Sequence, residues 1–214
     1  NILLCLLVLL SLHAKLYSQR DVTQFLGIPV DGYKSEMMQK LKNKGYTISP
    51  YNKDVLVGEF NGINVNIFIV TNNNKVYRIM VADANTIGET DIKIRFNRLL
   101  QQFKNNKNYL PSLLGNYDIP DDEDISHELL IKNKRYEAIF YQKPADYDSL
   151  NLEMQNIYGK ETINDEDKDR LRVIKESMIN LNKNVWFMIT ESNGKYSISM
   201  YYDNEYNRAN GEGL

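Results

Sequence analysis

Residues 55–83 read VLVGEFNGINVNIFIVTNNNKVYRIMVAD, and this stretch decides the fold. It contains three runs rich in β-branched and aromatic residues, which favour strands. Asn61-Gly62 separates the first two runs, and Asn72-Asn73-Asn74 separates the last two. Asn and Gly tolerate the positive φ that a type I′ turn needs, so each break predicts a hairpin. The stretch is therefore predicted to form an antiparallel meander.

The same pattern returns later in the chain. With a constant shift of 120 positions and no gap, residues 64–85 align with residues 184–205, so that Lys75 matches Lys195 and Asp83 matches Asp203. Residues 37–46 and 99–109 also resemble each other, each as a short amphipathic helix that ends in Lys and Asn and then a tyrosine. We therefore predict an α+β fold of two tandem units, each a helix packed on a four-stranded antiparallel sheet.

The predicted units cover residues 19–88 and residues 89–214. The helix of the first unit is expected over residues 33–44, with Asp31 as its cap and Gly45 as its stop. The helix of the second unit is expected to begin at Thr90 or Asp91 and to run to about Asn106, because residues 92, 96, 99 and 103 form an apolar stripe.

The second unit differs from the first between its helix and its last hairpin. Residues 109–124 are predicted to form a loop, because proline and glycine interrupt them, and residues 125–132 and 135–142 are predicted to pair as a hairpin. Residues 143–183 have no counterpart in the first unit. Residues 165–181 carry apolar side chains at helical spacing after Asn164, so we predict a helical insertion capped by that residue.

The first residues predict export. Residues 2–12 are almost entirely apolar and are followed by small residues at Ala14 and Ser18. A membrane-spanning helix needs about 20 apolar residues, so this run is too short for a span and is typical of a signal peptide, predicted here as residues 1–18. The protein is then periplasmic or extracellular, with no integral membrane span.

The residue inventory argues against catalysis and against nucleic acid. Cleavage after Ser18 would remove the only cysteine, Cys5, and one of the two histidines, which leaves His127. One histidine gives a weak basis for a Ser-His-Asp triad or a zinc site, and the acidic runs at residues 121–124 and 165–169 lack the spacing of a calcium loop, so we expect no metal and no cofactor. A formal net charge of −2 gives no general attraction to nucleic acid.

Aromatic residues on the last strands are the remaining functional signal. Tyr201 and Tyr202 are neighbours on one predicted strand and must point to opposite faces of the sheet, so one of them is expected to be exposed. Exposed tyrosine and tryptophan mark protein interfaces and sugar-binding platforms. The candidate binding residues are Tyr141, Trp186, Tyr201 and Tyr202; packing between strands is the structural alternative for them. For the basic helix at residues 90–106, a solvated face is favoured over an anion-binding surface.

Two resemblances extend these expectations. The pattern G-x-P-x-D-G-x-K-x-E at residues 27–36, followed by L-x-x-x-G-Y at residues 41–46, resembles uncharacterised exported proteins of Bacteroidetes-type bacteria. The tandem helix-plus-four-strand architecture is similar to that of beta-lactamase inhibitory protein, and to small outer-membrane assembly lipoproteins built on one such unit. This second resemblance implies protein binding rather than catalysis. The chain departs from the inhibitory protein by its helical insertion and by the lack of cysteine after residue 18.

Three functions follow as expectations. The first is an exported, non-catalytic module of the bacterial envelope that binds a protein or another ligand, with a protein or a glycan as the partner. The second is a hydrolase that acts on glycans through a carboxylate pair drawn from residues 121–124, Glu128 or Glu137, which must then lie in a cleft. The third is a structural component that associates with itself through an exposed edge strand.

Overall fold

Pairs of residues with positive φ mark the hairpins that the sequence predicts. The computed structural model describes residues 20–112, 117–178 and 183–209. In it, Asn61 (φ +53°) and Gly62 (φ +76°) join β4 (Val55–Phe60) to β5 (Ile63–Asn72). Asn73 and Asn74 (φ +46° and +61°) join β5 to β6 (Lys75–Asp83). Asn193 and Gly194 turn the chain from β9 (Asn184–Ser192) into β10 (Lys195–Asp203) in the same way.

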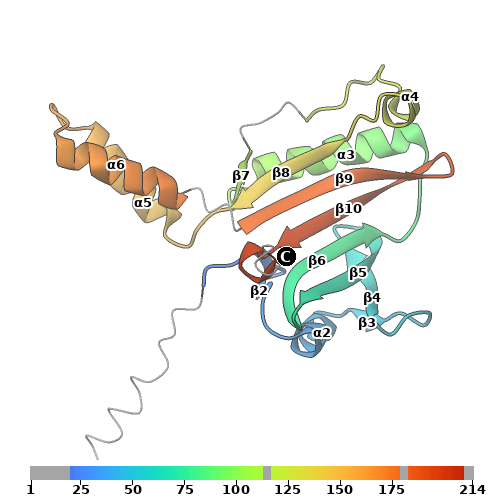
Figure 1. The fold of residues 1–214 in the computed structure, drawn as a ribbon. Coiled ribbons are helices and arrows are strands. Elements are labelled where there is room, and N and C mark those ends of the chain that lie inside the picture. Colours follow the sequence, from blue (N-terminus) through green and yellow to red (C-terminus); the bar gives the residue numbers. More distant parts are fainter. Residues whose placement is uncertain (1–19, 113–116, 179–182, 210–214) are drawn as a thin grey trace, which may run out of the picture.

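These hairpins belong to an eight-stranded antiparallel sheet (Figure 1), which confirms the α+β class. The strand order is β3-β4-β5-β6-β10-β9-β8-β7, where β3 is Thr47–Ile48, β7 is Tyr109–Pro111 and β8 is Glu137–Gln142. β6 and β10, which start and end 120 positions apart, pair at the centre with Met80 opposite Tyr201. Two tandem units would produce this order, and the equivalence of residues 19–88 and 89–214 stays a prediction.

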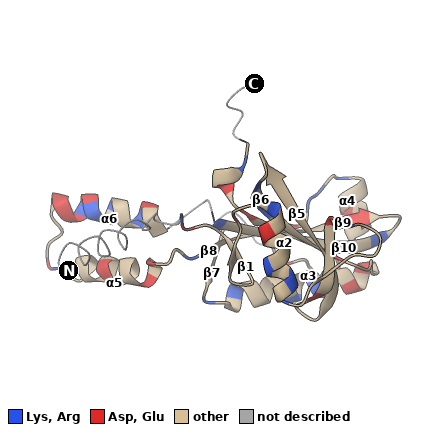
Figure 2. Cartoon of the chain, turned by 90° about the horizontal axis from the view of Figure 1, so that it is seen from below, with Lys and Arg blue, Asp and Glu red and all other residues tan. Residues whose placement is uncertain are grey.

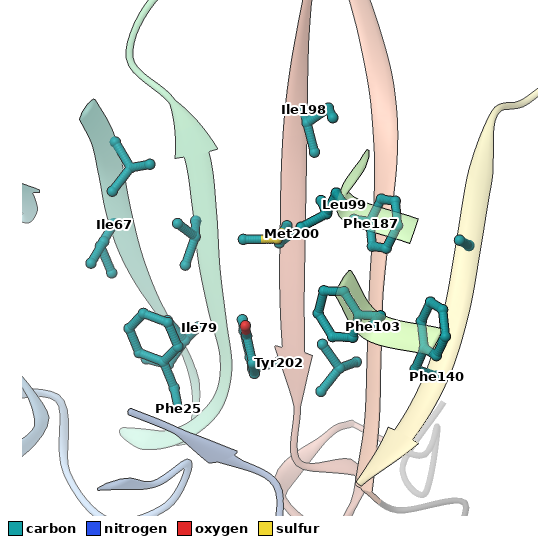
Figure 3. Packing of buried hydrophobic residues seen from close by; sticks show 14 of the residues in the cluster. Phe25, Ile67, Ile79, Leu99, Phe103, Phe140, Phe187, Ile198, Met200 and Tyr202 are labelled. Atoms are coloured by element: carbon teal, nitrogen blue, oxygen red, sulfur yellow. The ribbon is translucent and has the colours of Figure 1, made fainter. Parts of the chain in front are cut away.

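Helices α2 (Lys34–Asn43) and α3 (Glu89–Asn105) both pack on one face of the sheet. Figure 1 shows α3 behind β8 and β9, and Figure 3 shows its residues Leu99 and Phe103 among the apolar side chains of the strands. The ring centroid of Phe103 lies 4.9 Å from that of Phe140 on β8, and Phe96 lies 5.1 Å from Phe187 on β9. One apolar cluster joins both helices to both halves of the sheet.

A short two-stranded hairpin closes one end of this core. β1 (Gln24–Phe25) and β2 (Ile28–Pro29) pair around Leu26 and Gly27, which both have positive φ. The ring of Phe25 is almost fully buried and lies 4.8 Å from the ring of Tyr202. This hairpin therefore seals the apolar cluster ahead of α2.

The predicted strand at residues 125–132 is wrong: these residues form α4 (Ile125–Leu130). The carboxylate of Asp124 accepts a hydrogen bond from the backbone N–H of His127 at 2.8 Å, which is an N-cap and stabilises a helix at this point. The partner of β8 is instead β7, within residues 109–124 that were predicted as a loop. Pro111 is tolerated there because β7 is an edge strand.

Two predicted helix caps are also wrong. The N-cap of α2 is Tyr33, and the Asp31 carboxylate accepts hydrogen bonds from the Gly32 N–H and the Asn207 side chain instead. The N-cap of α3 is Gly88, so Thr90 and Asp91 lie inside the helix. The Asn164 cap of the insertion helix is confirmed, since its side chain accepts from the N–H of Asp167 at 2.8 Å.

The insertion between β8 and β9 is a helical hairpin that projects from the sheet (Figure 1). Its helices are α5 (Tyr147–Tyr158) and α6 (Asp165–Met178), and their apolar side chains form a cluster separate from the main core. We call this hairpin the arm. A short 3₁₀ turn, η2 (Glu205–Asn207), follows β10.

The predicted signal peptide, residues 1–18, lies outside the described residues. Within the described ranges, no helix has both the length and the apolar character that crossing a membrane requires.

A substitution at Gly58 tests how closely β4 packs against the ring of Tyr46. A Cβ at this position would lie 2.6 Å from Cδ1 of Tyr46, a buried residue whose ring would have to shift. We expect Gly58→Ala to lower the free energy of unfolding by about 1–3 kcal/mol, measured by urea denaturation. Gly159→Ala is the control, because its Cβ would meet no atom closer than 3.5 Å. Equal stability of the two variants would contradict this packing.

Candidate functional site

The face of the sheet opposite α2 and α3 is the candidate functional surface. None of the helices labelled in Figure 1 is drawn over the front of β6, β10 and β9. Along β9 buried and half-buried residues alternate from Asn184 to Thr190, and the half-buried Met80 on β6 and Tyr201 on β10 lie on the same side of the sheet as the half-buried Trp186. We call this side of the sheet the open face.

Strand register aligns five apolar side chains across the open face. Phe68 on β5 lies opposite Met80 on β6, and Met80 lies opposite Tyr201 on β10. Tyr201 lies opposite Trp186 on β9, which lies opposite Ile139 on β8. All five are half-buried. We call this line of residues the open-face row; it runs without a break across five neighbouring strands.

On one side of the open-face row, most of the neighbouring residues carry no charge. The adjacent register row consists of Val57, Asn66, Ala82, Ser199, Met188 and Glu137. Its single charged residue, Glu137, stands at the β8 end and pairs with Arg135 at 2.9 Å. The open-face row is therefore flanked on this side by small neutral groups. On its other side, the opposed residues Arg78 and Asp203 lie next to Met80 and Tyr201 and form an ion pair.

An ion pair at the end of β10 holds the two large rings of the row in place. The Arg78 guanidinium donates two hydrogen bonds to the Asp203 carboxylate, at 2.5 and 2.7 Å. The indole Nε1 of Trp186 donates to the same carboxylate at 3.0 Å. Trp186 stacks on Tyr201 with ring centroids 3.9 Å apart and planes 15° apart, while the Arg78 guanidinium carbon lies 4.9 Å from the Tyr201 centroid.

The contacts in this cluster favour the ionised forms of Arg78 and Asp203. Asp203 is 2% exposed, so its carboxylate depends on the three donors around it. The hydrogen bond with Asp203 raises the pKa of Arg78 above its ordinary value, against the opposing effect of burial. Two parallel hydrogen bonds fix the orientation of the Arg78 guanidinium relative to the Asp203 carboxylate. Because Trp186 binds this carboxylate and Tyr201 lies against this guanidinium, both rings are held in one orientation.

The structure brings three of the four predicted binding residues together. Trp186 and Tyr201 are in contact, and Tyr141 lies on the same face, opposite Asn184 and next to the row. Tyr202 points the other way: it is 4% exposed and belongs to the core. Its side chain is therefore not part of the open face, as the alternation between neighbours on a strand requires.

The sequence did not identify Phe68, Met80, Ile139, Arg78 or Asp203 as members of a site. Their strands were predicted, but the row exists only because β6 pairs with β10 and β9 with β8 in one particular register. The alignment of Asp83 with Asp203 was the one available signal. Both carboxylates bind an arginine on the finished sheet, Asp83 through Arg95 and Asp203 through Arg78.

Three of the six carboxylates proposed for a hydrolase are engaged in other contacts. Asp124 caps α4, Glu128 pairs with Lys132 at 2.7 Å, and Glu123 binds both Lys134 and the hydroxyl of Tyr136. Burial acts to raise the pKa of Glu123, but these two hydrogen bonds and the charges of the nearby lysines together lower it. None of these three acids lines the cleft between α3 and the β4–β5 turn that is described below. Within the described ranges, no three His, Cys, Asp or Glu side chains are grouped closely enough to hold a metal ion.

Three of the four basic side chains of α3 have partners within the molecule. Arg95 binds Asp83, Lys104 binds Asp118 at 2.8 Å, and Lys93 donates to two backbone carbonyls of residues 121 and 123. Figure 2 shows acidic as well as basic segments among the helices. These arrangements favour the structural interpretation of the basic helix over an anion-binding surface.

Replacing the carboxylate at the centre of the cluster tests its role. In Asp203→Asn, Arg78 keeps its place but loses its counter-charge in a largely buried setting, so we expect a loss of about 2–4 kcal/mol in the free energy of unfolding. Trp186 is the only tryptophan, so its fluorescence emission should shift as its bond to residue 203 changes. Asp54→Asn removes the exposed pair with Lys34 and should leave the denaturation midpoint nearly unchanged. Matching midpoints for both variants would contradict this account.

Comparison with protein-family models, with curated proteins and with solved structures found no match to this chain. The resemblances noted in the sequence therefore stay predictions.

Proposed function

We propose that the protein is an exported, non-catalytic binding module that captures another protein through its open face. The observation that carries this proposal is the open-face row: five apolar side chains in register across five strands, on a face that no labelled helix overlies. Apolar side chains at the centre of an otherwise polar surface gain free energy when a partner removes them from water.

The composition of the open face suits a protein partner. The cores of protein interfaces are enriched in aromatic residues and methionine and depleted in charge. The row supplies Trp186, Tyr201, Phe68 and Met80, with Met188 beside it. Methionine adapts to partner surfaces because its side chain is unbranched and polarizable. Trp186 and Tyr201, held by the Arg78–Asp203 pair, lose little conformational freedom on binding, and rings of this kind dominate interface energetics.

Export to the periplasm or beyond is part of the proposal and rests on residues 1–18 of the sequence. The same proposal places the partner in the cell envelope or outside the cell.

The two rival functions are less well supported. A carboxylate-dependent hydrolase needs two acids facing each other across a cleft, whereas Asp124 caps a helix and Glu123 and Glu128 form ion pairs. Self-association through an edge strand is opposed by the edges themselves. β3 has two residues, and β7 has three residues and contains Pro111, so each offers few free backbone groups for another chain.

A charge placed on the open face tests the proposal. The full chain, immobilised, is used to capture proteins from an envelope extract of its source, and the affinity of the captured protein is then measured for purified variants. Met188→Lys puts a cation beside the row and next to Glu137, and we expect it to weaken binding by about 2 kcal/mol, a roughly 30-fold rise in Kd.

The matched control is Leu130→Lys, which replaces an exposed leucine on α4, away from the open face. It should bind as the wild type does. Equal affinity of Met188→Lys and wild type, with both variants folded, would place the binding surface elsewhere. Loss of binding in both variants would show that general charge, rather than the open face, controls capture.

A further inference from the structure

A cleft on the helix side of the sheet, opposite the open face, has no role in the proposed protein capture. It has a volume of about 710 Å³, within the range of pockets that hold small molecules. It lies between α3, the β4–β5 turn, the residues that follow α2 and the β1–β2 turn. We call it the seam cleft, because residues from both halves of the chain line it.

The walls of the seam cleft are aromatic. Its aromatic lining residues are Tyr46, Phe60, Phe103, Tyr109 and Tyr202. The rings of Phe103 and Tyr109 meet edge to face, with centroids 4.8 Å apart. Figure 3 shows Tyr202 on β10, in the same layer of side chains as Phe25 and Phe103. These contacts fix the walls. Phe60 and Tyr109 are half-buried and can present part of their rings to a ligand, whereas Tyr46, Phe103 and Tyr202 are buried and support the walls.

The hydroxyl groups in the walls are neutral. Burial raises the pKa of Tyr202 and of Tyr109, and burial together with the nearby Glu59 raises the pKa of Tyr46. The Tyr46 hydroxyl donates to the backbone oxygen of Glu59 at 3.1 Å, and the Tyr109 hydroxyl accepts from Gln142 at 3.2 Å. The interior of the seam cleft therefore combines ring faces with uncharged hydroxyl groups.

The mouth of the seam cleft carries carboxamides and balanced charge. Asn61 donates to the Oε1 of Gln102 at 2.8 Å, which joins the β4–β5 turn to α3, and Asn106 stands one turn further along. Lys44 and Glu59 contribute one charge of each sign, and neither side chain forms an ion pair with a described residue. A net charge near zero gives no preference for a phosphate or a carboxylate ligand.

We propose that the seam cleft binds a short neutral saccharide. A sugar ring has apolar C–H faces that pack on aromatic rings, and hydroxyl groups that both donate and accept hydrogen bonds. The side-chain amides of Asn61, Gln102 and Asn106 also offer both a donor and an acceptor, so they complement such hydroxyl groups. An ion would instead require a surplus of opposite charge at the mouth.

The lining favours recognition over cleavage. Glu59 is the one carboxylate among the residues that line the seam cleft, and hydrolysis of a glycosidic bond uses two. The site is also separate from the open face, since Tyr202 and Tyr201 point to opposite sides of β10. Saccharide binding and protein capture can therefore be tested independently.

The experiment titrates the isotope-labelled full chain with maltose, cellobiose or N,N′-diacetylchitobiose and follows amide chemical shifts by NMR. We expect at least one of these disaccharides to bind with a Kd in the millimolar range or tighter and to shift amides of the β4–β5 turn and α3. Gln102→Trp should block the mouth and weaken that binding at least ~10-fold. Gln102 is exposed, so this replacement should not disturb the core.

The matched control is Gln101→Trp, which places the same ring on the same helix at an exposed position that does not line the cleft. It should bind saccharide as the wild type does, and so should Met188→Lys on the open face. Gln102→Ala provides a second test, because it removes the amide without filling the mouth and should also weaken binding. No shift with any of the three disaccharides, or equal binding by wild type and Gln102→Trp, would overturn the proposal.

Discussion

The antiparallel pairing of β6 with β10 is the constraint on which the rest of the molecule depends, because it joins the two halves of the chain into one sheet. The register places Ile79 opposite Tyr202 and Val81 opposite Met200 on the core side. It places Met80 opposite Tyr201 on the other side. A slip of one residue would exchange these two sets, burying the polar positions and exposing the core, so the hydrophobic pattern specifies the register strongly.

The Arg78–Asp203 pair reinforces that register at the end of the two strands, where the residues lie directly opposite each other. The same carboxylate receives the indole of Trp186 from β9, so one buried acid ties three consecutive strands together. This arrangement links stability and recognition: the interaction that fixes the centre of the sheet also orients the rings that the open face presents. A partly buried ion pair costs desolvation, and its use here is consistent with a role in specificity rather than in net stability.

Local signals predicted a large part of the fold. Asn-Gly and Asn-Asn turns located the hairpins around β5, β6, β9 and β10, and apolar periodicity located α2, α3 and α6. The error at residues 125–130 arose because a short apolar run with polar neighbours fits either period, and Asp124 was not considered as a cap. The candidate site was only partly predictable: alternation showed that Tyr201 and Tyr202 diverge, but which of them faces the helices depends on long-range pairing. The same pairing creates the row and the seam cleft, so neither can be seen in any single segment of sequence.

The arm is built so that it can unfold locally. Its apolar side chains pack on one another and not on the main core, and it is inserted between β8 and β9, which are neighbours in the sheet. β8 and β9 can pair only when the loop between them closes. The entropy cost of closure rises slowly with loop length, so the stability of the sheet depends little on the length of the insertion. A segment with its own small core can also unfold and refold as a separate cooperative unit while the sheet stays intact. Amide hydrogen exchange would then proceed at two distinct levels of protection, with the arm exchanging well before the central strands.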